Sequence, residues 1–215
     1  MEKKRTSRSR PIRLSSAVRK RSGDRYKGKP GRPEERTGYH PLFPRDFTFD
    51  TLLCNGRAKK TMQAVYIDHN LRAYGGLFYI FNEALYCIEV YSYPLDDFPF
   101  MHHVDGTSVV IVAQHRTDVL VEKMRRIDSA LIDKAMFFDS IPYDNRKYTN
   151  ALSQAVMQLR NLIFHRSFGF ASDSLGDIQL AKAIYRVDER GAYSVALCKC
   201  PFVITCTIPS ILNAF

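Results

Sequence analysis

The net charge of this 215-residue chain is confined to its first 37 residues, and this division most constrains what the chain can fold into. Residues 1–37 contain fourteen Lys or Arg residues and four acidic ones, so their net charge of +10 equals that of the whole sequence. Residues 38–215 are therefore neutral. The first segment has only four apolar side chains besides the initiator Met and a single aromatic ring. It cannot bury enough surface to offset the entropy lost on ordering, and we predict a disordered basic arm over residues 1–37.

The rest of the chain is rich in aromatic and β-branched side chains. Eight Phe or Tyr residues lie between Phe43 and Phe81, and such a density requires an interior in which to bury them. Residues 38–215 are long enough for one domain with its own core. The two prolines of "GYHPLFPRDF" predict a hinge where the arm meets this domain. The predicted organisation is an arm over residues 1–37 and a single globular domain over 38–215.

Strand patterns come first in this domain and helical patterns follow. Aromatic and β-branched segments separated by turn residues predict five strands, at 47–54, 61–70, 75–82, 84–93 and 107–115. Two later segments, 116–138 and 145–164, carry the helical period, and Thr117 or Asp118 is suited to cap the first. Residues 175–187 predict either a third short helix or a helix running into a strand. The nearly continuous apolar run 192–208 predicts a final buried strand.

The strand at 84–93 is apolar on both faces, which is typical of a strand covered on both sides. We therefore predict a mainly β fold, a jelly-roll-like sandwich with helical insertions, and keep an α+β fold as the alternative.

The C-terminal segment "CPFVITCTIPSILNAF" is apolar, but its sixteen residues include two prolines. A membrane-spanning helix needs about twenty residues, so we predict a buried strand and no membrane partner. A mitochondrial transit peptide is disfavoured at the other end, because the arm lacks the apolar face of an amphipathic helix.

The five cysteines form an odd set without a secretory signal, which indicates free thiols in a reducing compartment. A zinc site would use Cys198, Cys200 and Cys206. Zinc sites favour C-x₂-C pairs, whereas this chain has C-x-C. We therefore interpret these cysteines as buried core residues.

Catalytic motifs are missing from the sequence. It contains no glycine-rich phosphate loop, no G-x-S-x-G and no H-E-x-x-H. The densest polar segment is "DDFPFMHHVDG", in which His102 or His103 with Asp105 would suit a metal or a general base. Adjacent residues on an extended segment point in opposite directions, so we interpret it as an inter-strand loop, and His69 and His165 as structural. We predict no catalytic residue, no metal, no cofactor and no enzymatic activity.

A flexible polycation is suited to neutralising phosphates, because Lys and Arg displace the counterions of a nucleic acid. A neutral domain is better suited to binding copies of itself. This layout of basic arm, Pro-containing hinge and strand-rich domain resembles the coat proteins of small plant RNA viruses of the ourmiavirus type or, more distantly, the bromovirus and cucumovirus type. The helical stretch between residues 117 and 164 is longer than a minimal jelly roll contains.

The resemblance implies a viral coat protein, a structural capsid component of the virion that packages the genome and self-assembles as a homo-oligomeric shell. RNA is favoured over single-stranded DNA, and the host cytoplasm or nucleus are further expected locations. The residues implied to bind nucleic acid are Lys3, Lys4, Arg5, Arg8, Arg10, Arg13, Arg19, Lys20, Arg21, Arg25, Lys27, Lys29 and Arg32. A nuclear nucleic-acid-binding regulator, a viral movement or matrix protein with a basic tail, and an enzyme with a basic targeting tail are the alternatives.

Overall fold

The computed structural model describes residues 38–44, 47–49, 60–81, 84–171, 175–196 and 200–212. The basic segment 1–37 lies outside these residues. The disorder of the arm, its boundary at residue 37 and its thirteen nucleic-acid-binding residues therefore stay predictions.

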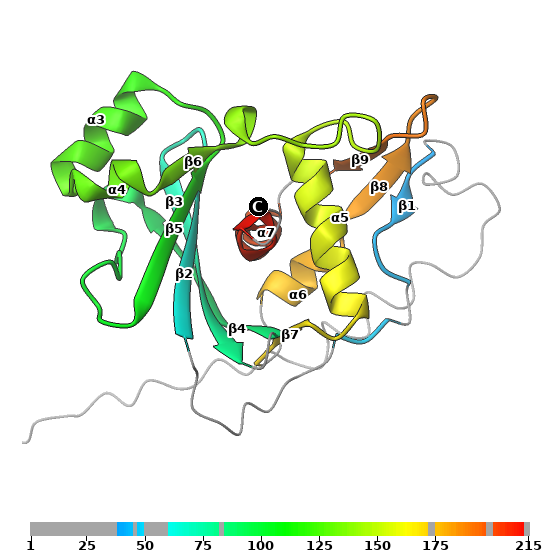
Figure 1. Ribbon diagram of the computed structural model, residues 1–215, viewed down its shortest axis with the longest axis horizontal. Coiled ribbons are helices and arrows are strands. Elements are labelled where there is room, and N and C mark those ends of the chain that lie inside the picture. Colours follow the sequence, from blue (N-terminus) through cyan, green and yellow to red (C-terminus); the bar gives the residue numbers. More distant parts are fainter. Residues whose placement is uncertain are drawn as a thin grey trace, which may run out of the picture. The chain divides into compact units, whose positions relative to one another are not determined.

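A six-stranded mixed sheet forms the centre of the described structure (Figure 1). Its spatial order is β6-β5-β2-β3-β4-β7. The pairs β2–β3 and β3–β4 are antiparallel, whereas β2–β5, β5–β6 and β4–β7 are parallel. The strands are β2 (Lys60–Ile67), β3 (Arg72–Phe81), β4 (Ala84–Pro94), β5 (Thr107–Ala113), β6 (Ala135–Phe137) and β7 (Phe168–Phe170). Four of the five strands predicted from the sequence are thereby confirmed. The fifth, 47–54, is described only at 47–49, which do not form a strand.

Helices cover both faces of this sheet, with α3 and α4 on one side and α7 and α5 on the other (Figure 1). Two separate hydrophobic clusters correspond to the two faces. The predicted helix 116–138 is divided, because it ends at Asp128 and its last residues form α4 and β6. The helices are α3 (Asp118–Ile127), α4 (Ala130–Asp133), α5 (Ala151–Phe164), α6 (Leu175–Leu180) and α7 (Pro201–Leu212), with short 3-10 turns η2 (Leu95–Asp97) and η3 (Phe138–Ser140).

The prediction of a terminal strand over 192–208 is wrong for most of its length. Only Tyr193–Ala196 form a strand, and the apolar run that follows is helix α7. Residues 202–211 of α7 are all buried, so the helix is apolar on every side and shows no period that would separate it from a buried strand. Pro201 occupies the first helical position, where its missing N–H costs nothing. No helix within the described residues is long and apolar enough to span a membrane.

Helix α7 lies close to the sheet because a glycine of β3 leaves room for it. A Cβ atom on Gly76 would stand 2.6 Å from the Phe78 ring and 3.1 Å from Thr205 of α7. Thr205 is fully buried, and its hydroxyl donates a hydrogen bond to the carbonyl oxygen of Tyr74 on β3 (3.1 Å). A glycine at position 76 therefore lets the helix approach the sheet closely enough for this bond to form.

A smaller antiparallel sheet of order β1-β8-β9 contains β1 (His40–Pro41), β8 (Ile184–Val187) and β9 (Tyr193–Ala196). Helix α6 is followed directly by β8, which confirms the predicted alternative of a helix running into a strand. The pairing of β1 with β8 joins the beginning of the described chain to its later part.

The described residues thus form mixed sheets with helices on both faces, an α/β arrangement. The predicted jelly roll is not found among them. Strand β4 is apolar on both faces because helices and loops cover it, and not because it faces a second sheet.

Thr117 caps helix α3, as the sequence predicts. Its hydroxyl accepts a hydrogen bond from the backbone N–H of Leu120 (3.2 Å). Removing this acceptor in Thr117→Ala should lower the free energy of unfolding by about 0.5–2 kcal/mol. The change should appear in thermal denaturation followed by circular dichroism as a melting temperature lower by roughly 2–4 °C per kcal/mol. Thr117→Ser keeps the hydroxyl and should melt near the wild type; equal melting of all three proteins would contradict the capping role.

Candidate functional site

The carboxyl ends of three parallel strands meet at one edge of the main sheet. Strand β2 pairs with β5 so that Ile67 lies beside Ala113, and β5 pairs with β6 so that Ala113 lies beside Phe137. Ile67, Ala113 and Phe137 are the last residues of these strands. They are followed by Asp68 after β2, Gln114 after β5 and the 3-10 turn after β6. In open α/β sheets ligands bind outside the carboxyl ends of the strands, where neighbouring connections diverge. The boundary between β2 and β5 is such a point, because β2 is followed by β3 on one side of it and β5 is followed by β6 on the other.

A cavity of about 350 Å³ lies at this edge. Its polar lining includes Gln114, His115 and Asp139, which follow strands β5 and β6. Leu152 of α5 and Ile204 of α7 give it an apolar side. An apolar pocket with a few convergent polar groups is the usual form of a binding site. We call this place the carboxyl-edge site.

His115 and Asp139 form a hydrogen-bonded pair in the carboxyl-edge site. The distance from His115 Nδ1 to Asp139 Oδ2 is 2.9 Å. The hydrogen bond from His115 holds the pKa of the Asp139 carboxyl below its ordinary value, so this group is a carboxylate at neutral pH. A carboxylate only accepts hydrogen bonds, so Nδ1 carries the proton, and Nε2 is the basic nitrogen of a neutral ring. This is the arrangement of a general base and the residue that orients it.

Two further hydrogen-bonded pairs lie at this edge of the sheet. The Tyr66 hydroxyl donates to Gln114 Oε1 (3.0 Å), and the Tyr74 hydroxyl donates to Asp68 Oδ2 (3.4 Å). Burial, followed by the charge of Asp68, raises the pKa of Tyr66 to about 12 and also raises that of Tyr74. Both tyrosines are therefore neutral hydrogen-bond donors. The Oδ1 atom of Asp68 accepts from the backbone N–H groups of Asn70 and Arg72 (2.9 Å each) and so shapes the turn between β2 and β3.

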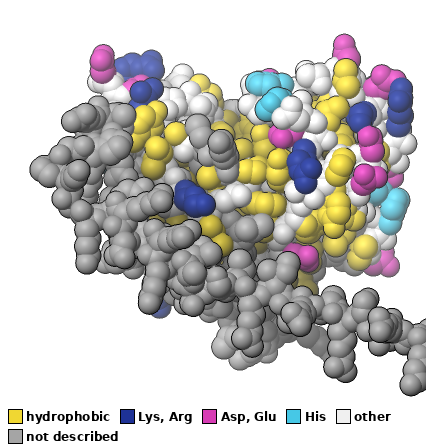
Figure 2. Space-filling view, turned by 180° about the vertical axis from the view of Figure 1, so that it is seen from behind, with side chains coloured by type: hydrophobic (Ala, Val, Ile, Leu, Met, Phe, Trp, Pro, Cys, Tyr) yellow, Lys and Arg dark blue, Asp and Glu magenta, His cyan; other side chains and the backbone are white. Residues whose placement is uncertain are grey.

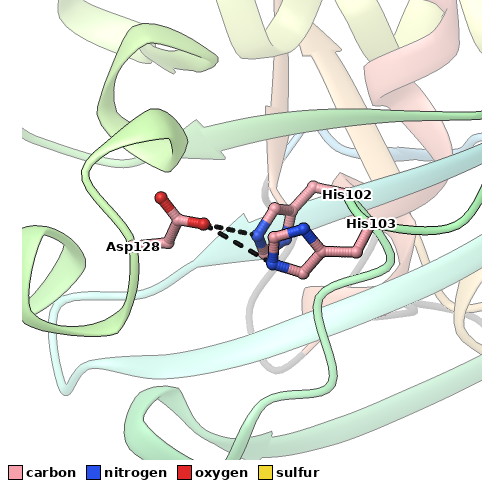
Figure 3. Close-up of side chains that lie close together, drawn as sticks. All are labelled: His102, His103 and Asp128. Atoms are coloured by element: carbon pink, nitrogen blue, oxygen red, sulfur yellow. Dashed lines mark hydrogen bonds and ion pairs between the residues drawn. The ribbon is translucent and has the colours of Figure 1, made fainter.

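A second polar cluster contains His102 and His103, where the sequence predicted an ordinary inter-strand loop (Figure 3). The two rings do not point in opposite directions, because they belong to a turn and not to an extended segment. Both Nε2 atoms approach Oδ2 of Asp128, at 2.7 and 3.6 Å. The acid of the cluster is therefore Asp128, and not Asp105 as the sequence suggested. The backbone N–H of Ala130 and then His102 hold the pKa of Asp128 below its ordinary value.

The described residues give no support to a zinc site formed by Cys198, Cys200 and Cys206. Cys200 is buried directly before α7 and Cys206 is buried within it, whereas Cys198 lies outside the described residues. Within the described ranges, the cluster of His102, His103 and Asp128 is the only group of three potential metal ligands.

Basic and acidic side chains are interspersed on the surface of the domain. Figure 2 shows Lys and Arg beside Asp and Glu over the described part of one face. On helix α3, Lys123 pairs with Asp96 and Arg126 with Glu122. These pairs leave α3 with a mixed face.

Comparisons with known proteins identify the fold. No protein-family model matches the sequence, and no curated protein sequence matches it either. Among solved structures, the chain is similar to the large terminase of a thermophilic bacteriophage, with a TM-score of 0.51 and 10% sequence identity over 94% of this chain. The chain spans 52% of that terminase.

Two further terminase structures have TM-scores too low to support an argument of their own. The nuclease domain of the g2p large terminase of bacteriophage SPP1, with bound Mn, has a TM-score of 0.47 and 11% identity over 74% of this chain and 89% of that one. The large terminase nuclease of the thermophilic phage G20c has a TM-score of 0.44 and 12% identity over 69% and 80%.

The likeness to a large terminase overturns several predictions from the sequence. The resemblance to plant-virus coat proteins is wrong, and so are the coat-protein function, the capsid shell and the exclusion of an enzyme, because the chain shares its fold with a large terminase. The preference for RNA finds no support either, and neither do two of the alternatives, the nuclear nucleic-acid-binding regulator and the viral movement or matrix protein. The coat-protein prediction failed because it rested on a basic N-terminal segment and on overall composition. Proteins of many different folds share such features.

The described residues of the carboxyl-edge site do not provide a set of three metal ligands. Here His115 and Asp139 pair with each other. Among the described residues no third His, Cys, Asp or Glu ligand atom lies within 4.8 Å of both. The side chains as placed do not form a ready metal site at this edge, and the chemistry below uses protein groups alone.

Proposed function

We propose that this protein is a DNA-processing enzyme of the terminase kind that hydrolyses phosphodiester bonds at the carboxyl-edge site. The observation that carries the proposal is the His115–Asp139 pair in a cavity at the carboxyl ends of parallel strands. The likeness of the fold to a large terminase supports DNA as the substrate. These 215 residues contain no glycine-rich phosphate loop, so ATP hydrolysis is not part of the proposal.

The proposed reaction uses water as the nucleophile. His115 Nε2 takes a proton from a water molecule while the water oxygen forms a bond to phosphorus. The bond from phosphorus to one sugar oxygen breaks, and the departing oxygen takes a proton from solvent. Asp139 accepts a hydrogen bond from Nδ1 throughout and stabilises the imidazolium that forms. The products are one strand end with a phosphate and one with a hydroxyl group.

Neutral donors and one cation at the edge are suited to holding the phosphate. The amide nitrogen of Gln114 carries donor N–H groups, while its oxygen is engaged by Tyr66. Arg116 follows His115 directly, and its guanidinium lies 5.9 Å from the centre of the Phe137 ring at the end of β6. This placement brings a permanent positive charge to the same edge of the sheet.

The basic segment 1–37 supplies the sequence-independent part of DNA binding in this proposal. A protein that neutralises several phosphates loses about a thousandfold or more in affinity between 50 and 200 mM salt. We expect the DNA affinity of the full chain to fall in this way as the salt concentration rises. After deletion of residues 2–36, which contain all fourteen basic residues of the segment, the affinity should depend only weakly on salt. Fluorescence anisotropy with a labelled duplex measures both slopes. An unchanged slope in the truncated protein would place the DNA contacts elsewhere.

The activity itself is tested with supercoiled plasmid DNA. The purified full chain should convert it to nicked and linear forms on an agarose gel. The activity should elute with the protein through size-exclusion chromatography. If column fractions containing pure protein left the plasmid intact over hours, the proposed function would be rejected.

A further inference from the structure

We infer that His102, His103 and Asp128 form a binding site for a divalent transition-metal ion such as zinc, separate from the carboxyl-edge site. The three side chains come from two elements: the loop between β4 and β5, and the end of α3 (Figure 3). This cluster lies near the amino end of β5, whereas His115 follows its carboxyl end. The seven residues of β5 separate the two ends by about 20 Å.

The distances among the three ligand atoms are close to those of a metal site. Zinc bonds of about 2.0–2.2 Å in tetrahedral geometry place neighbouring ligand atoms about 3.3 Å apart. His102 Nε2 and His103 Nε2 lie 2.7 and 3.6 Å from Asp128 Oδ2, and all three atoms lie within 4.8 Å of one another. Shifts of a fraction of an ångström in two of these separations would admit the ion.

Two of the ligands are held in place before any ion binds. The side chain of His102 is only 8% exposed, and its Nδ1 atom is enclosed and makes no hydrogen bond within the described structure. Nε2 is therefore the nitrogen of this ring that an ion could reach. Asp128 caps the end of α3, and its Oδ1 accepts from the N–H of Ala130 (2.9 Å). This bond leaves Oδ2 directed toward the two rings.

A buried glutamine fixes the loop that carries the two histidines. Gln63 on β2 is fully buried, and its Oε1 accepts a hydrogen bond from the backbone N–H of Met101 (2.8 Å). Its Nε2 donates to the Tyr91 hydroxyl (2.7 Å) and to the Pro99 carbonyl oxygen (2.8 Å). The residue preceding His102 is thereby tied to the central sheet. A ligand set held in advance binds with less loss of entropy.

The chemistry of the ligands selects the class of ion. Two imidazoles and one carboxylate suit zinc and other divalent transition metals, whereas magnesium and calcium prefer oxygen ligands alone. The side chain of His103 is 78% exposed, so this ligand lies at the opening of the site. With three protein ligands, a fourth position remains for water.

Zinc titration of the full chain, stripped of metal with a chelator, tests this inference. Isothermal titration calorimetry should give one zinc per chain at this site. His103→Ala should lower its affinity at least about tenfold, because even the loss of a residue that only supports a ligand costs that much. His165→Ala, which removes another exposed histidine, should bind zinc as the wild type does. Bound Co²⁺ should show visible bands without the intense near-ultraviolet absorption of thiolate ligands.

His103→Ala carries the test because its exposed side chain can be removed without disturbing the fold. Asp128→Asn is a second variant, and it too should lose the site if it folds. At the same zinc concentration, zinc should raise the melting temperature of the wild type more than that of His103→Ala. Equal zinc binding by wild type and His103→Ala, or no binding by the wild type, would overturn the inference. DNA cleavage is not part of the readout, so failure here leaves the proposed function untouched.

Discussion

Replacing His115 with alanine should slow DNA cleavage by about 100- to 10,000-fold, the usual contribution of a general base. The loss should appear in the single-turnover rate at saturating DNA, because His115 acts on the water and adds little to binding. Its side chain is 60% exposed, so the melting temperature should stay unchanged. Asp139→Asn should also slow the reaction strongly, because the negative charge that stabilises the imidazolium is lost and the amide N–H can donate to Nδ1, which reverses the tautomer of the ring.

The matched control is His165→Ala. His165 is an exposed histidine at the end of α5, remote in sequence from both members of the pair. This variant should cleave at the wild-type rate and bind DNA equally well. Wild-type cleavage by His115→Ala would show that the pair in the cavity is not the general base.

Adding a single methyl group at Gly76 should destabilise the whole domain. The new Cβ atom would stand 2.6 Å from the ring of Phe78, which is fully buried. Crowding of this kind costs about 1–3 kcal/mol. Thermal denaturation of Gly76→Ala should show a melting temperature lower by roughly 2–4 °C for each kcal/mol. The hydrogen bond from Thr205 to Tyr74 should be strained as α7 is pushed away from β3.

The double variant Gly76→Ala/Phe78→Leu separates crowding from a general effect of changing the strand. A shorter side chain at position 78 makes room for the methyl group, so the double variant should be more stable than the sum of the two single losses predicts. Strict additivity would mean that contact with Phe78 is not the cause. Wild-type melting of Gly76→Ala would mean that α7 does not approach β3 as closely as described.

The strands could be predicted from the sequence, but the layer that covers them could not. Aromatic and β-branched segments separated by turn residues predicted β2 to β5 within a few residues of their observed bounds. The apolar faces of β4 correctly indicated two covered sides, yet a helical layer and a second sheet leave the same pattern on the strand. Helix α7 was missed for a related reason, since an apolar run buried on every side has no period to reveal it.

The candidate sites could be predicted even less well, because their members are brought together by the topology of the sheet. Asp68, His115 and Asp139 lie far apart in the sequence, and the parallel register of β2, β5 and β6 brings them to the same edge of the sheet. The adjacent histidines at 102 and 103 were visible as candidates. Their partner Asp128 could not be recognised, because the sequence pattern predicted one helix up to residue 138, whereas α3 ends at Asp128.

Cleavage of a DNA duplex in ¹⁸O-labelled water tests the proposed function most directly. If the full chain hydrolyses phosphodiester bonds with water, mass spectrometry of the products should find one ¹⁸O atom in each newly formed terminal phosphate. His115→Ala, purified in parallel, should give almost no labelled product in the same time, which also excludes a contaminating nuclease. Intact duplex in the wild-type sample, or cleaved ends without the label, would contradict hydrolysis at the carboxyl-edge site.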